Sequence, residues 1–108
     1  MRRCEVFVHK IKAGELTEMN SEQYVFQYDK AYLLNKNNPP VCLNMPLREE
    51  PYLSNHLFAY FFNMLSEGEN RVMQSQYLRI SPDDDFGILL ATAQFDTIGA
   101  VTVIPIEQ

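Results

Sequence analysis

Four side chains of this sequence could ligate a metal or act as nucleophiles: His9, His56, Cys4 and Cys42. A metal site needs such ligands at short spacings such as C-x-x-C or H-x-x-x-H. None of these spacings occurs here. We therefore expect no metal site. His9 is expected on a surface strand, His56 at the start of a helix, and the two cysteines as free thiols.

Three consecutive carboxylates, Asp83-Asp84-Asp85, could suit a cation or general acid chemistry. They follow Ser81 and Pro82, however, which are typical of a helix cap and of the first helical position. Acids at a helix N-terminus are stabilised by the helix dipole, so we interpret them as part of a helix start. Glycine-rich phosphate-binding patterns and the G-x-S-x-G pattern are absent. We expect no catalytic residues, no cofactor and no enzymatic activity.

The aromatic residues Phe26, Tyr28 and Tyr32 could stack on nucleic-acid bases or pack in a core. A nucleic-acid surface carries positive charge beside such residues. This chain has 14 acidic and 9 basic residues and a net charge of −5, so a phosphate backbone would be repelled. We favour core packing and expect no direct binding of nucleic acid.

The length of 108 residues suits one domain, which we place at 1–108. No apolar run reaches the roughly 18–20 residues of a membrane span. Charged residues interrupt the segment after Arg2 and Arg3, so no signal peptide is expected. These features predict a cytoplasmic protein.

Alternating and β-branched residues predict an N-terminal antiparallel meander and one late strand. Gly14, within the segment Lys12 to Glu15, is expected at the first turn because glycine adopts positive φ freely. Pro105 places the last strand near a sheet edge. The expected strands are Cys4 to Ile11, Leu16 to Met19, Tyr24 to Tyr28 and Ala100 to Ile106.

The segment Asp29 to Leu34 could begin a helix or extend a strand, whereas Val41 to Met45 is expected to be a short extended segment. Between them, Asn35 to Pro40 has the composition of a loop.

The centre of the chain, Leu57 to Leu65, carries two apolar stripes at helical spacing. We expect a helix there, capped by Ser54 or Asn55 and ended by Gly68. A helix with two apolar sides must be covered on both. Either it runs through the core, or one stripe binds a partner protein.

Two further helices are expected. Glu69 to Ile80 places its apolar residues on one side and Arg71, Gln74, Ser75 and Arg79 on the other; the apolar ones are Val72, Met73, Tyr77 and Ile80. The helix after Ser81 carries a core-facing stripe of Phe86, Leu89, Leu90 and Ala93. The predicted fold is α+β, an antiparallel meander with about three helices packed against it in a single domain.

Six short motifs along the chain resemble, in the same order, motifs of the opening domain of the HipA-type serine/threonine kinases. Phe62 to Arg71 is similar to the family's N-L-L-P-E-G-x-x-R stretch, and Phe95 to Val101 to its G-x-D-x-x-G-A-V. The other matching segments are Gly14-x-Leu16, Phe26-x-Tyr28-x-x-x-Tyr32, Pro40 to Leu47 and Asp85 to Leu90.

The resemblance implies a domain without catalytic residues, because the nucleotide loop and catalytic aspartate of these kinases lie downstream of it. A free-standing version resembles HipS, the small antitoxin of tripartite HipB–HipS–HipT systems, which supplies the domain to the kinase HipT and neutralises it. The implied partners are a HipT-like kinase and, in a ternary complex, a HipB-like DNA-binding protein. Three roles stay open: an inhibitor, a structural subunit of a split kinase, and an assembly factor of a repressor complex.

Partner binding is expected on the central helix and the segment that follows it. The candidate residues are Phe58, Phe62, Leu65, Ser66, Glu67, Gly68, Glu69, Asn70 and Arg71. We expect the segment Ser66 to Arg71 to reach toward the kinase's active-site cleft. The alternatives are that this segment only connects two helices and that the central helix belongs wholly to the core.

Overall fold

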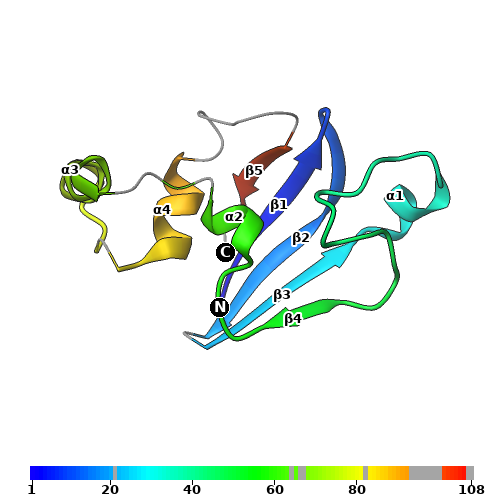
Figure 1. The fold of residues 1–108 in the computed structure, drawn as a ribbon, viewed down its shortest axis with the longest axis horizontal. Coiled ribbons are helices and arrows are strands. Elements are labelled where there is room, and N and C mark those ends of the chain that lie inside the picture. The colour runs from blue at the N-terminus through cyan, green and yellow to red at the C-terminus, as the bar shows by residue number, and fades with distance from the viewer. Residues whose placement is uncertain (21, 64, 66–67, 82, 93–100, 107–108) are drawn as a thin grey trace.

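An antiparallel sheet of five strands forms the centre of the computed structural model, which describes residues 1–20, 22–63, 65, 68–81, 83–92 and 101–106 (Figure 1). The strand order is β4-β3-β2-β1-β5. The strands are β1 Arg2–Val8, β2 Ile11–Asn20, β3 Gln23–Tyr28, β4 Tyr52–Ser54 and β5 Val101–Pro105. The described residues also form the helices α1 Lys30–Leu34, α2 Ala59–Phe62, α3 Gly68–Leu78 and α4 Asp85–Thr92. The α+β class and the N-terminal meander are confirmed, and β5 lies at a sheet edge as expected from Pro105.

The first hairpin turns at His9 and Lys10, not around Gly14, and His9 therefore lies in a turn rather than in a strand. Both turn residues have positive φ, 49° and 69°. Val8 pairs with Ile11, so only two residues join β1 to β2. Turns of this length favour such a left-handed backbone because it matches the twist of the flanking strands.

Gly14 instead lies inside β2, between Val6 of β1 and Tyr28 of β3. A Cβ at this position would stand 2.3 Å from the carbonyl oxygen of Gln27. The glycine is therefore needed for close approach of the two strands, and its freedom to turn is not used.

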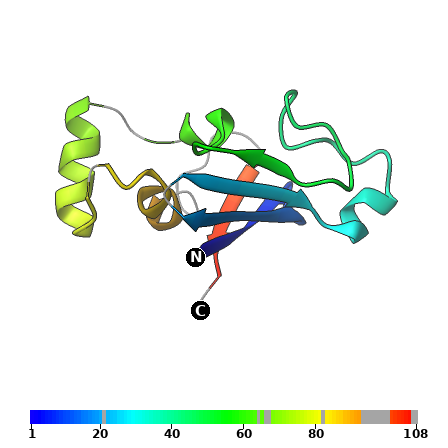
Figure 2. The same ribbon diagram turned by 90° about the horizontal axis from the view of Figure 1, so that it is seen from below.

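One face of the sheet is buried and the other is open. The buried face contributes Val6, Leu16, Phe26 and Val103 to the core. The open face carries ion pairs, among them Lys12 Nζ to Glu5 at 3.2 Å and to Glu15 at 3.4 Å. In Figure 2, α2 lies on one side of the sheet, and α1 and α4 lie beside opposite ends of its strands.

The expected central helix is reduced to the single turn α2, Ala59–Phe62. Its N-cap is Phe58, which makes no side-chain cap hydrogen bond, so the expected cap by Ser54 or Asn55 is wrong. Ser54 belongs to β4, and its hydroxyl accepts a hydrogen bond from the exposed His56 backbone at 3.1 Å. Tyr52 to Ser54 form this strand because they pair with β3 as its outer neighbour.

Helix α4 begins at Asp85, one turn later than Ser81. Asp84 caps it: its Oδ1 accepts the Gly87 N–H at 3.1 Å, and its carbonyl accepts the Ile88 N–H. Ser81 Oγ accepts the Asp83 N–H at 3.3 Å, before the helix begins. The three carboxylates therefore do mark a helix start, but the middle one is the cap.

The segment from 29 to 45 resolves into helix α1 followed by a loop of turns. Lys30–Leu34 are helical, which settles the open choice between helix and strand. Val41 to Met45 are not extended but form bends and turns. Phe26, Tyr28 and Tyr32 are buried, and the rings of the two tyrosines stack with centroids 6.0 Å apart, so core packing is confirmed.

Cys4 and Cys42 are free thiols, as predicted. No described helix is long and apolar enough to cross a membrane. Pro82, Ala93 and the segment Phe95 to Ala100 lie outside the described residues.

Candidate protein-interaction surface

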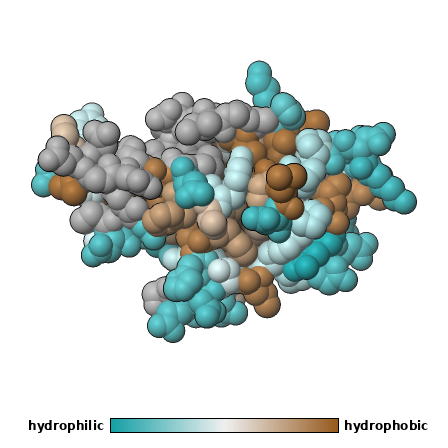
Figure 3. All heavy atoms as spheres, viewed as in Figure 1, coloured by the Kyte–Doolittle hydropathy of each residue, from teal (hydrophilic) through white to brown (hydrophobic). Residues whose placement is uncertain are grey.

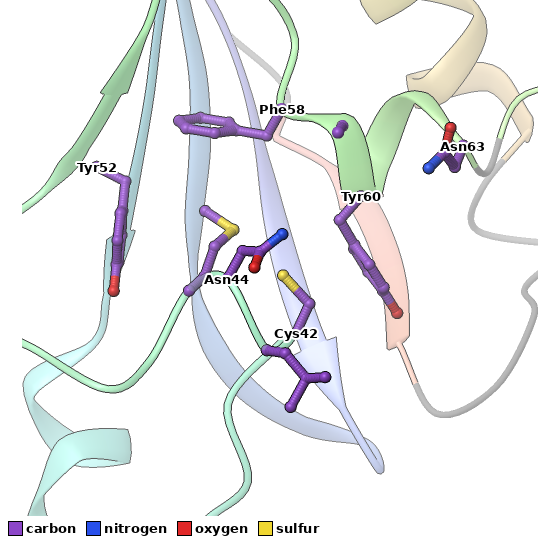
Figure 4. Close-up of a pocket in the computed structure, with 9 residues that line it drawn as sticks. Cys42, Asn44, Tyr52, Phe58, Tyr60 and Asn63 are labelled. Atoms are coloured by element: carbon purple, nitrogen blue, oxygen red, sulfur yellow. The ribbon is translucent and has the colours of Figure 1, made fainter.

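A groove of about 520 Å³ opens between α2 and the loop that precedes β4. Tyr52 borders it from β4, and Figure 4 shows Phe58, Tyr60 and the Cys42 thiol directed around the same space. The remaining lining residues are Leu43, Asn44, Met45, Ala59 and Asn63. None of these nine described residues carries a charged side chain, so the part of the groove that they line suits an apolar or aromatic group of another molecule.

Tyrosine hydroxyls hold the loop that forms one wall of this groove. Tyr28 donates a hydrogen bond to the Met45 carbonyl and accepts one from the Val41 N–H at 2.9 Å. Tyr32 and Tyr52 donate to the carbonyls of Pro39 at 2.5 Å and Pro46 at 2.6 Å. Burial raises the pKa of Tyr28 to about 12, so the hydroxyl stays protonated and able to donate. The wall is therefore fixed before any ligand arrives.

The two apolar stripes around α2 have different surroundings. Leu57, Phe61 and Leu65 are buried in the core, where the Phe61 ring lies 6.1 Å from that of Phe26. Phe58 is half-buried beside the groove, and Phe62 is 39% exposed. One stripe thus belongs to the core and the other reaches the surface. Figure 3 shows apolar residues at the surface over α2 and the neighbouring loop.

The candidate binding segment Ser66 to Arg71 is only partly described. Ser66 and Glu67 lie outside the described residues, and Gly68 to Arg71 form the first turn of α3. The backbone from Gly68 onward is therefore helical rather than a loop. A role for Ser66 to Arg71 in partner binding stays a prediction.

Helix α3 has its apolar side outward. Val72, Met73 and Tyr77 are exposed, whereas Ser75, expected on the polar side, is buried. Ile80, beyond the helix end, is the member of the expected apolar side that packs against the core. The exposed side of α3 and the exposed loop residue Leu43 could not be inferred from the sequence alone. The spacing of apolar residues identifies an apolar side of a helix but not what covers it.

A charged cluster joins the N-terminus to the start of α4. Arg2 donates two hydrogen bonds to the Asp84 carboxylate, at 2.8 and 2.9 Å, and a third to Glu18 at 2.8 Å. The bonds from Arg2 hold the pKa of Asp84 below its ordinary value. The Arg2 side chain also lies over the Phe86 ring, 5.4 Å from its centroid. The bonds between Arg2 and Asp84 hold the start of α4 against β1, so this charged cluster has a structural role.

The described residues offer little for metal or thiol chemistry. Within them, no three His, Cys, Asp or Glu side chains gather where a metal ion could be held. Burial raises the pKa of the Cys4 thiol to about 12, which removes its thiolate at neutral pH.

Comparison with known proteins identifies relatives along nearly the whole chain. A family model described as the HipA N-terminal domain matches residues 4–104. A Sinorhizobium fredii protein named "Putative kinase Y4mE" is 30% identical over 95 residues, which make up 88% of this chain but 22% of that protein. An uncharacterized protein of Haemophilus influenzae is 28% identical over 103 residues, 95% of this chain and 92% of that protein.

A solved structure described as the N-terminal domain of HipA toxin shares the fold. It matches with a TM-score of 0.74 and 25% identity, over 100% of this chain and 95% of the other. The chain thus spans about a fifth of the Sinorhizobium fredii protein and nearly all of the HipA domain. The sequence resemblance to the opening domain of HipA-type kinases is confirmed.

Proposed function

Because this chain belongs to the HipA N-terminal domain family, we propose that it binds a HipA-type serine/threonine kinase of the HipT kind and holds that kinase inactive. In this role it is a HipS-like antitoxin and not an enzyme. The observation that carries the proposal is the extent of the match: residues 4–104 correspond to the domain, which makes up 22% of the Sinorhizobium fredii protein named as a kinase. A domain that is one part of such a chain has a surface adapted to the remainder.

The surface around α2 supports binding in trans. Phe58 borders a groove of about 520 Å³ whose described lining residues are uncharged, and Phe62 is exposed on the same helix turn. Leu65, the third apolar candidate, is buried in the core. Contacts of the kinase with Ser66 to Arg71 remain part of this proposal. We propose that the kinase covers this region and works in the cytoplasm, where ATP is available.

Co-expression with the HipA-type kinase of the same organism tests this role. The kinase alone should arrest growth, and a kinase variant without its catalytic aspartate should not. Co-expression of this chain should restore growth, and the two proteins should purify together. Growth arrest that persists although the complex forms would contradict the antitoxin role and favour a structural subunit.

A HipB-like DNA-binding protein is the proposed third partner. Operator binding by the complex, measured with and without this chain, tests an assembly role. With a net charge of −5, this chain is not expected to contact the DNA itself.

A further inference from the structure

Helix α3 exposes three apolar side chains and buries a serine. Ser75 is 2% exposed, and its hydroxyl donates to the Val72 carbonyl of the same helix at 2.7 Å. On the outer side Val72 is 46% exposed, Met73 67% and Tyr77 89%. Met73 and Tyr77 are four residues apart and therefore neighbours on one face. A helix covered only by its own domain would show the opposite arrangement.

The helix end is fixed to the domain, so this face has a defined direction. Ile80 donates its N–H to the Ser75 carbonyl at 2.9 Å, and Arg79 adopts a left-handed φ of 59°. These are the features of a Schellman motif, which ends a helix and turns the chain. Ile80 then packs against the core. In Figures 1 and 2, α3 stands at one end of the molecule, away from the sheet.

The extent of the relatives indicates what covers the face. In the Sinorhizobium fredii protein named as a kinase, the matched region is 22% of the chain, so most of that protein is available to pack against the domain. A helix of 11 residues is marginally stable by itself in water, and burial of its apolar face against a larger body would stabilise it.

We propose that the Val72, Met73 and Tyr77 face of α3 docks in an apolar groove on the body of the HipA-type kinase. This inference rests on the proposed function and extends the interface from α2 to the far end of the molecule. These contacts are apolar, so their contribution to affinity is not screened by salt as that of a charged patch would be. The recognition mode is that of a helix in a groove, with Met73 and Tyr77 as anchors four residues apart.

The decisive variant is the double substitution Met73→Glu with Tyr77→Lys. It removes both exposed apolar side chains, leaves the net charge unchanged, and places Glu four residues before Lys, an arrangement that stabilises a helix. A loss of binding therefore does not come from melting of α3, which circular dichroism checks. Tyr77→Ala provides a second variant without new charges.

Leu34 provides the matched control. It ends α1 and is 85% exposed, close to the 89% of Tyr77. Leu34→Lys thus repeats the Tyr77→Lys part of the double variant at a similarly exposed apolar residue elsewhere on the molecule.

Affinity for the purified HipA-type kinase of the same organism, measured by calorimetry at low and high salt, decides the matter. We expect the double variant to bind about tenfold more weakly or worse, as for the loss of an aromatic hot spot, and Leu34→Lys to bind like the wild type. Wild-type binding that the double variant retains would overturn the inference and leave the proposed function standing. A wild-type chain that does not bind would overturn both.

The size of the isolated chain in solution tests the competing occupant. We expect a monomer for the wild type and for the double variant. A wild-type dimer that dissociates on Met73→Glu with Tyr77→Lys would assign the face to a second copy of this chain and overturn the inference.

Discussion

Helices α3 and α4 follow each other in the chain, and both carry apolar residues at helical spacing, yet they are used in opposite ways. α4 buries Phe86, Ile88 and Leu89 completely. α3 exposes Met73 and Tyr77 and buries Ser75 instead. The core thus includes the apolar side of α4 and leaves that of α3 at the surface.

The difference lies in how each helix is anchored. The cap residue of α4, Asp84, is bound by Arg2 of β1, and the Phe86 ring lies 6.1 Å from that of Tyr24 in β3. α3 is tied to the domain at its C-terminal end through Ile80. An apolar helix face in a sequence therefore indicates a packing surface. Only the tertiary structure shows whether the same chain covers that surface.

Truncation of a buried ring should give the largest effect on stability and the clearest contrast between the helices. Phe86→Ala is expected to lower the free energy of unfolding by about 3–5 kcal/mol, because it removes a fully buried side chain and leaves a cavity. Tyr77→Ala, the matched change on α3, should change it by no more than about 0.5 kcal/mol. Urea denaturation measures both. Equal losses for the two variants would mean that α3 is held by its own domain.

Crowding of the sheet should have the next largest effect. Gly14→Ala would place a Cβ 2.3 Å from the Gln27 carbonyl oxygen, a backbone atom. We expect a loss of about 1–3 kcal/mol, typical of overpacking, measured by urea denaturation. An unchanged midpoint would show that β2 and β3 can separate without cost.

Removal of the Asp84 charge should have a smaller effect, one that depends on pH. Asp84→Asn keeps a side chain able to cap α4 but breaks the two-bond pair with Arg2, so we expect a loss of about 1 kcal/mol at neutral pH. Because the pKa of Asp84 is lower in the folded protein than its ordinary 3.8, the wild type holds this stabilisation above that value and loses it as the pH falls through the folded pKa.

The difference between wild type and variant should therefore shrink in acid. Asp83→Asn is the control, since it makes the same change in charge at the exposed neighbour. A pH-independent difference, or an equal loss in the control, would remove the role assigned to the Arg2–Asp84 pair.

The sequence predicted elements well where the pattern is local. Strand alternation identified β1, β3 and β5, and the acids at 83–85 identified the start of α4. The turn predicted at Gly14 was wrong because glycine suits both a turn and a close contact between strands. Its pairing with Tyr28 shows that the close contact is the reason here. β4 was missed because three residues become a strand only by pairing with β3.

The candidate surface was predicted only in part. Phe58 and Phe62 were found because they lie on a second apolar stripe. The groove depends on Leu43 and Tyr52, which distant tyrosine hydrogen bonds and strand pairing bring beside α2. The outward face of α3 could not be predicted, since its pattern is the same as that of a core helix.

The central claim is that this domain binds a HipA-type kinase and holds it inactive. Autophosphorylation of the purified kinase, followed as this chain is added, tests it most directly. We predict that activity falls to background when the two proteins reach equal amounts. A complex that forms at that ratio while autophosphorylation continues unchanged, or increases, would contradict the claim.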